Sequence, residues 1–272
     1  MDRLYDRLLA YGFHRGSRRA SVQDLIVRYG EPAVIRIDSV EEYLSLAVDE
    51  VDIRGELGCI VPPYEHLFIE SAFFIKPRHT KDSYPHKFNR HGAFVNSEQT
   101  DGGWSVVVER VADVDSVLLS SRVLLTVDLD AAGEFLDAKA VSLVPGESPD
   151  TEQELRECLS LLYALSLLHY KDHALVEDEV PKRVRKKAVR KNKPLVRSHT
   201  LEIKAMKEYV RRVREAEKTG IKVGVHTVRG HKVTYTEAAP LFGKHVGTYF
   251  KAPHIRGSNS EGLVLKDYEV TL

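Results

Sequence analysis

The most constraining feature of this sequence is an apolar helical pattern that extends from residue 151 to about residue 169. Thr151 and Glu154 stand at the spacing of a capping box, which predicts a helix start there. Apolar residues recur at helical spacing on one side and also fill the other sides, so we expect this helix to be buried all round. A buried helix needs a covering layer, which the rest of the chain must supply. The regularly spaced residues are Leu155, Cys158, Leu159, Leu162, Leu165 and Leu168.

The covering layer is predicted within residues 58–144, where runs of β-forming residues alternate with turn signals. Asp101-Gly102-Gly103 predicts a turn before Trp104, the single tryptophan, which we expect to lie in the core. Glu70 lies in an apolar strand, so it is expected either on an open sheet face, which we favour, or as a paired functional carboxylate. The predicted sheet is antiparallel, with five strands near 66–75, 92–97, 104–111, 116–128 and 135–144.

The chain is therefore predicted to be an α+β protein. In this fold an antiparallel sheet packs on a long buried helix, and a basic C-terminal β-hairpin region follows. With 272 residues, of which 43% are hydrophobic, the chain is long enough to bury a sizeable core. We divide it into an N-terminal helical segment (1–57), a sheet plus core helix (58–172) and a basic C-terminal region with a hairpin (173–272).

The formal net charge is zero, but the charges are unevenly placed. Residues 181–257 contain 21 Lys and Arg against 5 Asp and Glu, and the remaining residues contain 19 against 35. Such asymmetry favours a basic part that binds nucleic acid and an acidic part that does not. The alternative is that the two parts neutralise each other across an internal interface.

The densest basic run is residues 181–193, with eight Lys and Arg and no acidic residue. This density favours phosphate contacts, and the lack of aromatic residues indicates that the run positions a backbone rather than reading bases. A helix over 204–218 is expected to add Arg211, Arg212, Arg214 and Lys218 to the same positive face. The predicted nucleic-acid-binding residues are Lys182, Arg183, Arg185, Lys186, Lys187, Arg190, Lys191, His245, His254 and Arg256.

Residues 222–257 bring histidine and arginine together most densely. Strands are expected on each side of Gly230, with a return strand that completes a hairpin. Arginine binds phosphate bidentately, and histidine can act as acid or base near neutral pH. His231, Arg229 and His226 could therefore cleave RNA without a metal, although the cluster could also bind without catalysis or be purely structural. No metal site is predicted, because no CxxC completes the histidines, and we expect no cofactor.

Two features predict the cellular compartment. Cys59 and Cys158 adjoin apolar residues, so two buried thiols without a disulfide framework indicate a reducing environment. The N-terminus lacks the apolar region of a signal peptide, and no run has the apolar length of a membrane span. We therefore expect a cytoplasmic protein with no membrane contact.

Short motifs in the C-terminal half resemble a family of uncharacterised proteins carried by bacteriophages, prophages and related elements. They are Leu168-His169-Tyr170-Lys171-Asp172, a Lys/Arg segment closing on Lys193-Pro194, His199-Thr200-Leu201-Glu202-Ile203, His226 with Arg229-Gly230-His231, and His254-Ile255-Arg256-Gly257. Pro62-Pro63-Tyr64 and Leu67-Phe68-Ile69-Glu70 are similar too. The resemblance implies a mobile-element origin and a role inside a host bacterial cell, and it assigns no catalytic residue.

Three hypotheses follow from these observations. The first is a phage-type nucleic-acid-binding protein, with RNA as the expected partner. The second is a metal-independent endoribonuclease. The third is an inhibitor that binds a host protein or defence system and whose acidic part imitates nucleic acid.

Overall fold

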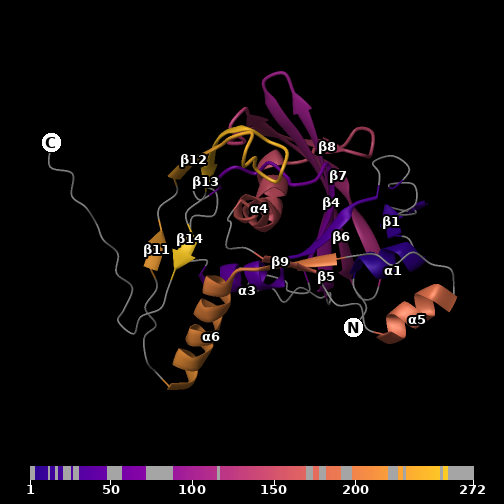
Figure 1. Ribbon diagram of the computed structural model, residues 1–272. Helices are drawn as coiled ribbons and strands as arrows, with labels where there is room; N and C mark the ends of the chain where they lie inside the picture. Colours follow the sequence, from indigo (N-terminus) through magenta and orange to yellow (C-terminus); the bar gives the residue numbers. More distant parts are fainter. Residues whose placement is uncertain are drawn as a thin grey trace, which may run out of the picture.

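The fold was obtained as a computed structural model, and its centre is one large sheet (Figure 1). The residues described are 4–11, 13–15, 18–20, 26, 31–47, 57–71, 88–114, 117–169, 174–177, 182–190, 198–219, 226–228, 231–251 and 254–256. The sequence also predicts a helix over 21–29, a long polar loop at 76–92 and a last strand at 263–271. Apart from residues 26 and 88–92, these segments lie outside the described ranges. The sheet draws strands from all three segments that we predicted.

Within the described residues the sheet has ten strands, and it is mixed rather than purely antiparallel. In spatial order the strands are β2 (Arg18–Ala20), β1 (Phe13–Arg15), β7 (Val117–Asp130), β6 (Gly103–Val114), β5 (Phe88–Thr100), β4 (His66–Ser71), β3 (Ala33–Arg36), β10 (Ser198–Glu202) and β9 (Ala174–Glu177), and β8 (Phe135–Ser142) also pairs with β7. The predicted α+β class and the mostly antiparallel sheet are confirmed. The prediction of five strands was wrong, because β3 pairs in parallel with both β4 and β10, which are distant in sequence.

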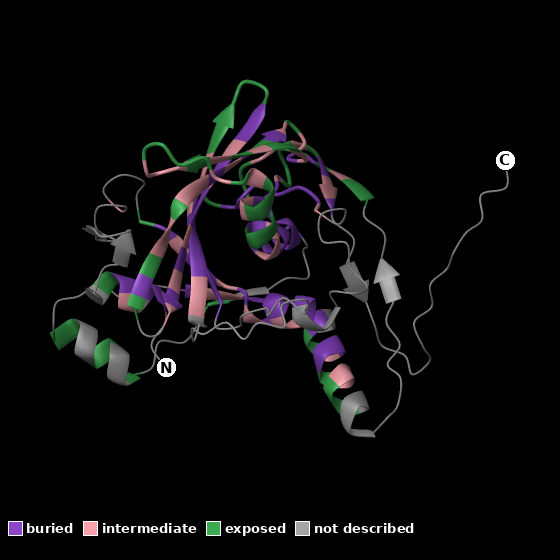
Figure 2. Cartoon of the chain, turned by 180° about the vertical axis from the view of Figure 1, so that it is seen from behind, coloured by how far each residue is buried: buried purple, intermediate pink, exposed green. Residues whose placement is uncertain are grey.

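One sheet face carries the larger hydrophobic core. It packs against α3 (Asp38–Ala47), α4 (Thr151–Leu167) and α6 (Lys204–Thr219). The aromatic rings of Tyr43 on α3 and Tyr209 on α6 meet edge to face at 5.3 Å. In Figure 2 the buried residues concentrate between α4 and the strands. Trp104 is buried here, as predicted from the sequence.

The opposite face has a smaller core beneath α1 (Leu4–Tyr11). Tyr5 packs on Phe68 at a ring distance of 5.0 Å, and Phe68 packs on Phe94 at 4.7 Å. Glu70 lies on this face but is buried, and its Oε2 accepts a hydrogen bond of 2.9 Å from the backbone N–H of Tyr5. The prediction that Glu70 lies on an open sheet face was therefore wrong. Its carboxylate accepts a hydrogen bond from a backbone N–H in the first turn of α1, where no partner within the helix exists.

The predicted apolar helix corresponds to α4, which ends two residues earlier than expected and is enclosed only in its second half. All residues from 161 to 169 are buried, whereas Glu152, Gln153, Arg156 and Glu157 are exposed. The helix cap is Asp150, whose Oδ1 accepts hydrogen bonds from Glu152 and Gln153. Thr151 instead accepts a hydrogen bond from Ala140 of β8, so a sheet contact replaces the predicted capping box.

An arginine on the sheet fixes the exposed half of α4. Arg110 of β6 forms ion pairs with Glu154 at 2.5 Å and with Glu157.

Among the described residues, no helix has the length and apolar character that crossing a membrane requires.

Candidate functional site

The basic run becomes the helix α5 (Lys182–Arg190), which has six Lys and Arg in nine residues and no acid. Its described cationic side chains, those of Lys182, Arg185, Lys186 and Arg190, are all exposed. None of these four forms an ion pair with a carboxylate in the part of the chain that the structure describes. The positive charge of α5 is therefore available to a ligand.

The protein gives α5 little structural support. Val189 has 73% of its surface exposed, and no other described helix or strand packs extensively against α5. An isolated helix of nine residues is marginally stable in water, and its like charges repel one another.

The neighbouring basic helix, α6, is different because its arginines are already paired. Arg211 contacts Glu208 at 2.6 Å and Glu215 at 2.7 Å, and Arg212 contacts Glu208 at 2.8 Å. Hydrogen bonds from Arg211 and then Arg212 lower the pKa of Glu208 to about 2. Arg214 pairs with Glu42 on α3. The prediction that these arginines extend one positive face was wrong.

The histidine-rich segment forms two separate ribbons rather than the one hairpin that the sequence predicts. β12 (His231–Tyr235) pairs with β13 (Gly247–Lys251), and β11 (His226–Val228) pairs with β14 (His254–Arg256). His231 is exposed and lies opposite Lys251. His226 and His231 therefore belong to different sheets, which separates two of the three predicted catalytic residues.

The register of the β11–β14 ribbon brings other predicted residues together. His226 lies opposite Arg256, and Val228 lies opposite His254. Opposed residues share a face, as do residues two apart in one strand. Positions 226, 254 and 256 therefore belong to the same face of the ribbon. Arg229 and Lys191 lie outside the described residues, and Arg183 and Lys187 belong to α5.

The helix α5 and the two ribbons lie on opposite sides of the molecule (Figure 1). The predicted residues thus fall into separate regions rather than one anion-binding surface. These regions are α5, the β11–β14 ribbon, and the segment that joins β12 to β13, which contains His245.

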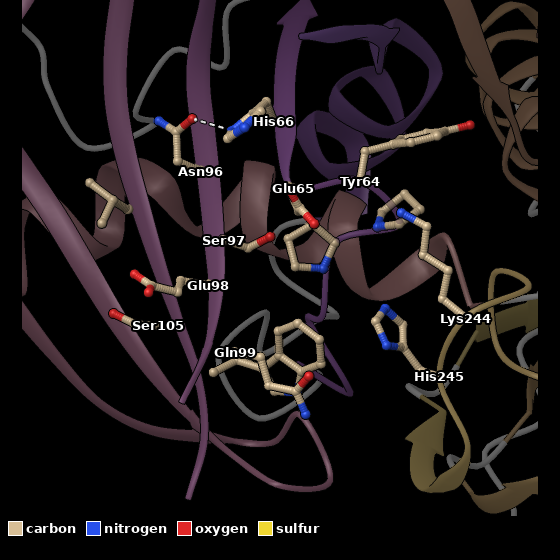
Figure 3. Close-up of a pocket in the computed structure, with 14 residues that line it drawn as sticks. Tyr64, Glu65, His66, Asn96, Ser97, Glu98, Gln99, Ser105, Lys244 and His245 are labelled. Atoms are coloured by element: carbon tan, nitrogen blue, oxygen red, sulfur yellow. Dashed lines mark hydrogen bonds between the residues drawn. The ribbon is translucent and has the colours of Figure 1, made fainter. Parts of the chain in front are cut away.

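His245 belongs to a pocket of about 550 Å³ at the end of the sheet, where β4 begins and β5 and β6 meet (Figure 3). Its imidazole meets Trp104 edge to face at 4.8 Å. Burial, and then the charge of Lys244, lower the pKa of His245, so the ring is neutral near pH 7. On the other side of the pocket a hydrogen bond of 3.2 Å joins His66 Nδ1 and Asn96 Oδ1.

The ribbon that carries His245 is anchored by a buried histidine at the end of α4. His169 Nε2 lies 3.3 Å from the carbonyl oxygen of Val61, and its ring packs against Phe242 at 5.0 Å and Tyr249 at 6.4 Å. Burial lowers the pKa of His169 to about 4, so it is neutral at physiological pH. Phe242 has a positive φ of 52°, a strained conformation that places its ring in this contact.

Sequence reasoning did not find the pocket, although two of its signals were visible. Pro62-Pro63-Tyr64 and Trp104 were noted separately, but only the fold places them beside Lys244 and His245. Within the described residues, no group of three or more His, Cys, Asp and Glu is arranged to hold a metal ion.

Comparison with known proteins adds little to this geometry. No family model matches the chain, and no curated protein matches it. A solved structure titled "Crystal structure of AcrVA2" aligns over 83% of this chain and 72% of that chain, with 14% identity and a TM-score of 0.28. A TM-score at this level does not establish a shared fold.

Proposed function

We propose that the protein binds nucleic acid through the phosphate contacts of α5. The observation that supports this most is a surface helix with six Lys and Arg, no acid and four exposed cations without a described partner. Cations of this kind release counterions from a polyanion, which drives association without base recognition. RNA is the partner that we expect. The resemblance to phage proteins implies that the protein acts inside a host bacterial cell.

The length of α5 limits how strongly it can bind. Lys182 and Arg190 are eight residues apart, which corresponds to about 12 Å along a helix. A nucleic-acid strand presents only a few phosphates over this distance, so roughly four contacts are expected. The slope of log affinity against log salt concentration should then be about −3.6 for a duplex.

The decisive variant replaces Lys182, Arg185, Lys186 and Arg190 with glutamine. Its affinity for a fluorescent RNA or DNA oligonucleotide should fall roughly 100-fold at 0.1 M salt, because these contacts supply most of the binding. Fluorescence anisotropy across a salt series measures both the affinity and the slope.

The matched control replaces Lys207, Arg211, Arg212 and Arg214 of α6 with glutamine. It removes the same number of positive charges, but from side chains that carboxylates already pair. This control should bind within about threefold of wild type. Equal losses in the two variants would show that overall charge, and not α5, determines binding. An α5 variant that binds like wild type would refute the proposal.

A second function, metal-independent RNA cleavage, is favoured by the register of the β11–β14 ribbon. That register assigns His226, His254 and Arg256 to one face. One imidazole would take the proton of a 2′-hydroxyl as its oxygen attacks phosphorus. The other would protonate the departing 5′-oxygen, and the guanidinium would stabilise the charged phosphorane. The products are a 2′,3′-cyclic phosphate and a free 5′-hydroxyl.

Labelled RNA incubated with EDTA tests this activity. His226→Ala and His254→Ala should each abolish cleavage, whereas His231→Ala, on the other ribbon, should retain it. Loss with His231→Ala alone would favour the set predicted from the sequence. The absence of cleavage by the wild-type protein would remove the candidate while leaving the α5 proposal intact. Binding to a host protein through the acidic part remains a prediction from the sequence, and no described feature favours it over nucleic-acid binding.

A further inference from the structure

The pocket beside His245 opens on the sheet face that carries the larger core. Trp104 belongs to that core, and Gln99 lies directly opposite Trp104 in the register of β5 and β6. Opposed residues share a face, as do residues two apart in one strand, so Ser97 lies on this face as well. Figure 3 shows Ser97, Gln99 and His245 around the same space. Glu98 belongs to the opposite face by the same register and takes no part in the site.

The floor of this space is apolar. Pro62 and Pro63 are buried there, and they continue directly from Val61 of the larger core. Tyr64 follows at the rim with 40% of its surface exposed, so its ring is available to a ligand. A floor of this kind holds compact apolar groups, and the few polar groups around it determine which ligand enters.

Trp104 carries a hydrogen-bond donor that no described residue satisfies. Only 8% of its surface is exposed, and the N–H of a tryptophan buried to this extent normally has an acceptor. The indole N–H of Trp104 forms no hydrogen bond with the described residues, yet it is not sealed from solvent. Because Trp104 lines the pocket, we place this donor at the pocket wall, where a ligand with an acceptor can reach it.

The two charges at the rim are separated. Lys244 is exposed and forms no ion pair with a described carboxylate, and Figure 3 shows its side chain directed toward Tyr64. Glu65 lies at the β5 side, where its carbonyl oxygen accepts a hydrogen bond of 2.9 Å from the N–H of Ser97. An acidic residue of a ligand would therefore pair with Lys244, at the end of the pocket where Tyr64 lies.

The ligand that fits these features brings both compact apolar rings and unpaired carbonyl oxygens. A segment in the polyproline II conformation has both, because its backbone forms no internal hydrogen bonds. Grooves lined by aromatic residues bind such segments, whose rigid conformation reduces the entropy lost on binding. A nucleobase would instead need the open face of an aromatic ring, and Trp104 exposes too little surface for stacking.

We propose that this pocket binds a proline-rich segment of a partner protein, in the polyproline II conformation and with an acidic residue beside the prolines. The Trp104 N–H donates to a carbonyl oxygen of the segment, and its proline rings pack on Tyr64 and over Pro62 and Pro63. Lys244 pairs with the acidic residue. This site is distinct from α5 and does not depend on the proposed nucleic-acid binding.

Trp104 is the only tryptophan of the chain, so its fluorescence reports on the pocket directly. The probes are an oligoproline peptide that ends in a pair of glutamates, the same peptide ending in glutamines, and a glycine-serine peptide of equal length ending in glutamates. The first should change the emission of Trp104 in a saturable titration of the full chain. The glutamine peptide should bind about two- to fivefold more weakly. The flexible glycine-serine peptide should bind at least about tenfold more weakly, because it loses more entropy on binding.

Three variants and one control locate the site, with the anisotropy of a labelled oligoproline peptide as the readout. Tyr64→Ala should weaken binding about three- to tenfold through the lost aromatic contact. Trp104→Phe keeps a ring but removes the donor, and should cause a similar loss. Lys244→Gln should make the glutamate and glutamine peptides bind equally. Val246→Ala, an exposed neighbour that does not line the pocket, should have no effect.

Tyr64→Ala keeps the test decisive even if Trp104→Phe does not fold, because the Tyr64 side chain is exposed. An unchanged affinity for Tyr64→Ala, or binding that leaves the Trp104 emission unchanged, would overturn the assignment to this pocket. Equal binding of the glycine-serine peptide would refute polyproline II recognition, as would no binding of either proline peptide. A change of Trp104 emission with a single-stranded RNA oligonucleotide, but not with oligoproline, would show that the pocket takes a nucleobase instead.

Discussion

The helices α5 and α6 each carry six Lys and Arg, but the four described cations of α5 are exposed without an ion pair in the described part of the chain, whereas the described arginines of α6 are paired. In α6 the arginines pair with Glu208 and Glu215 of the same helix and with Glu42 of α3. Its apolar residues Met206, Tyr209 and Val210 are buried, so the helix is part of the core. The comparison teaches that the number of cations in a helix does not predict its surface charge, because the pairing depends on neighbours.

The largest expected difference between the helices concerns stability. Met206→Ala on α6 should lower the free energy of unfolding by about 2–5 kcal/mol, because Met206 is fully buried and its truncation leaves a cavity in the core. Val189→Ala on α5 should change it by less than about 0.5 kcal/mol. Urea unfolding of the full chain measures both. A cost above about 1 kcal/mol for Val189→Ala would show that α5 is packed in solution and would break the contrast.

Acid should affect the core but not α5. The pKa of His169 is lowered to about 4 by burial, so the unfolded chain binds a proton that the folded chain excludes. The free energy of unfolding is therefore unaffected by His169 above about pH 6.5. As the pH falls toward 4, protonation of His169 in the unfolded chain lowers the free energy of unfolding by up to about 3 kcal/mol. α5 contains no histidine or carboxylate that titrates in this range. Urea midpoints at pH 7.5 and pH 5 should differ less in His169→Gln, and an unchanged difference would exclude His169 as the cause.

Salt should separate the helices in the binding assay. Raising the salt from 50 to 200 mM should weaken nucleic-acid binding by wild type and by the α6 control roughly 100-fold, for four phosphate contacts. The α5 variant should show a much flatter dependence. A wild-type slope shallower than −1 would mean that few of the exposed cations contact phosphate.

The smallest expected effect comes from releasing the paired arginines. Glu208→Gln removes the shared partner of Arg211 and Arg212, and should raise nucleic-acid affinity about two- to fivefold without a measurable change in unfolding. Gln153→Glu, which adds an acid on the exposed side of α4, serves as a distant control. An unchanged affinity for Glu208→Gln would indicate that α6 faces away from the bound strand.

Local sequence signals predicted much of the fold. The turn at Asp101-Gly102-Gly103, the helix over 151–169 and the exposed basic run each depend on neighbours within a few residues. What depends on distant residues was not predictable in this way. The parallel pairing of β3 with β10, the hydrogen bond from Tyr5 to Glu70 and the pairing of Arg214 with Glu42 all join residues far apart in the chain.

The candidate sites show the same limit. The basic run was found because a high density of Lys and Arg is visible in the sequence. Whether that run and the histidines form one surface depends on their positions in space, which the sequence alone does not give. The sequence predicted residues 226 and 231 in one hairpin, but the chain divides them between two ribbons. The pocket combines residues from 62 to 245, so no local pattern could reveal it.

The parallel pairing of β3 with β10 has a consequence for synthesis of the protein. Residues 33–36 leave the ribosome long before residues 198–202, so β3 must wait with one edge open for about 160 residues of translation. Pairing over such a separation slows folding, and an open strand edge invites association with other chains. The nascent protein is therefore expected to depend on a chaperone most strongly in the interval before β10 emerges.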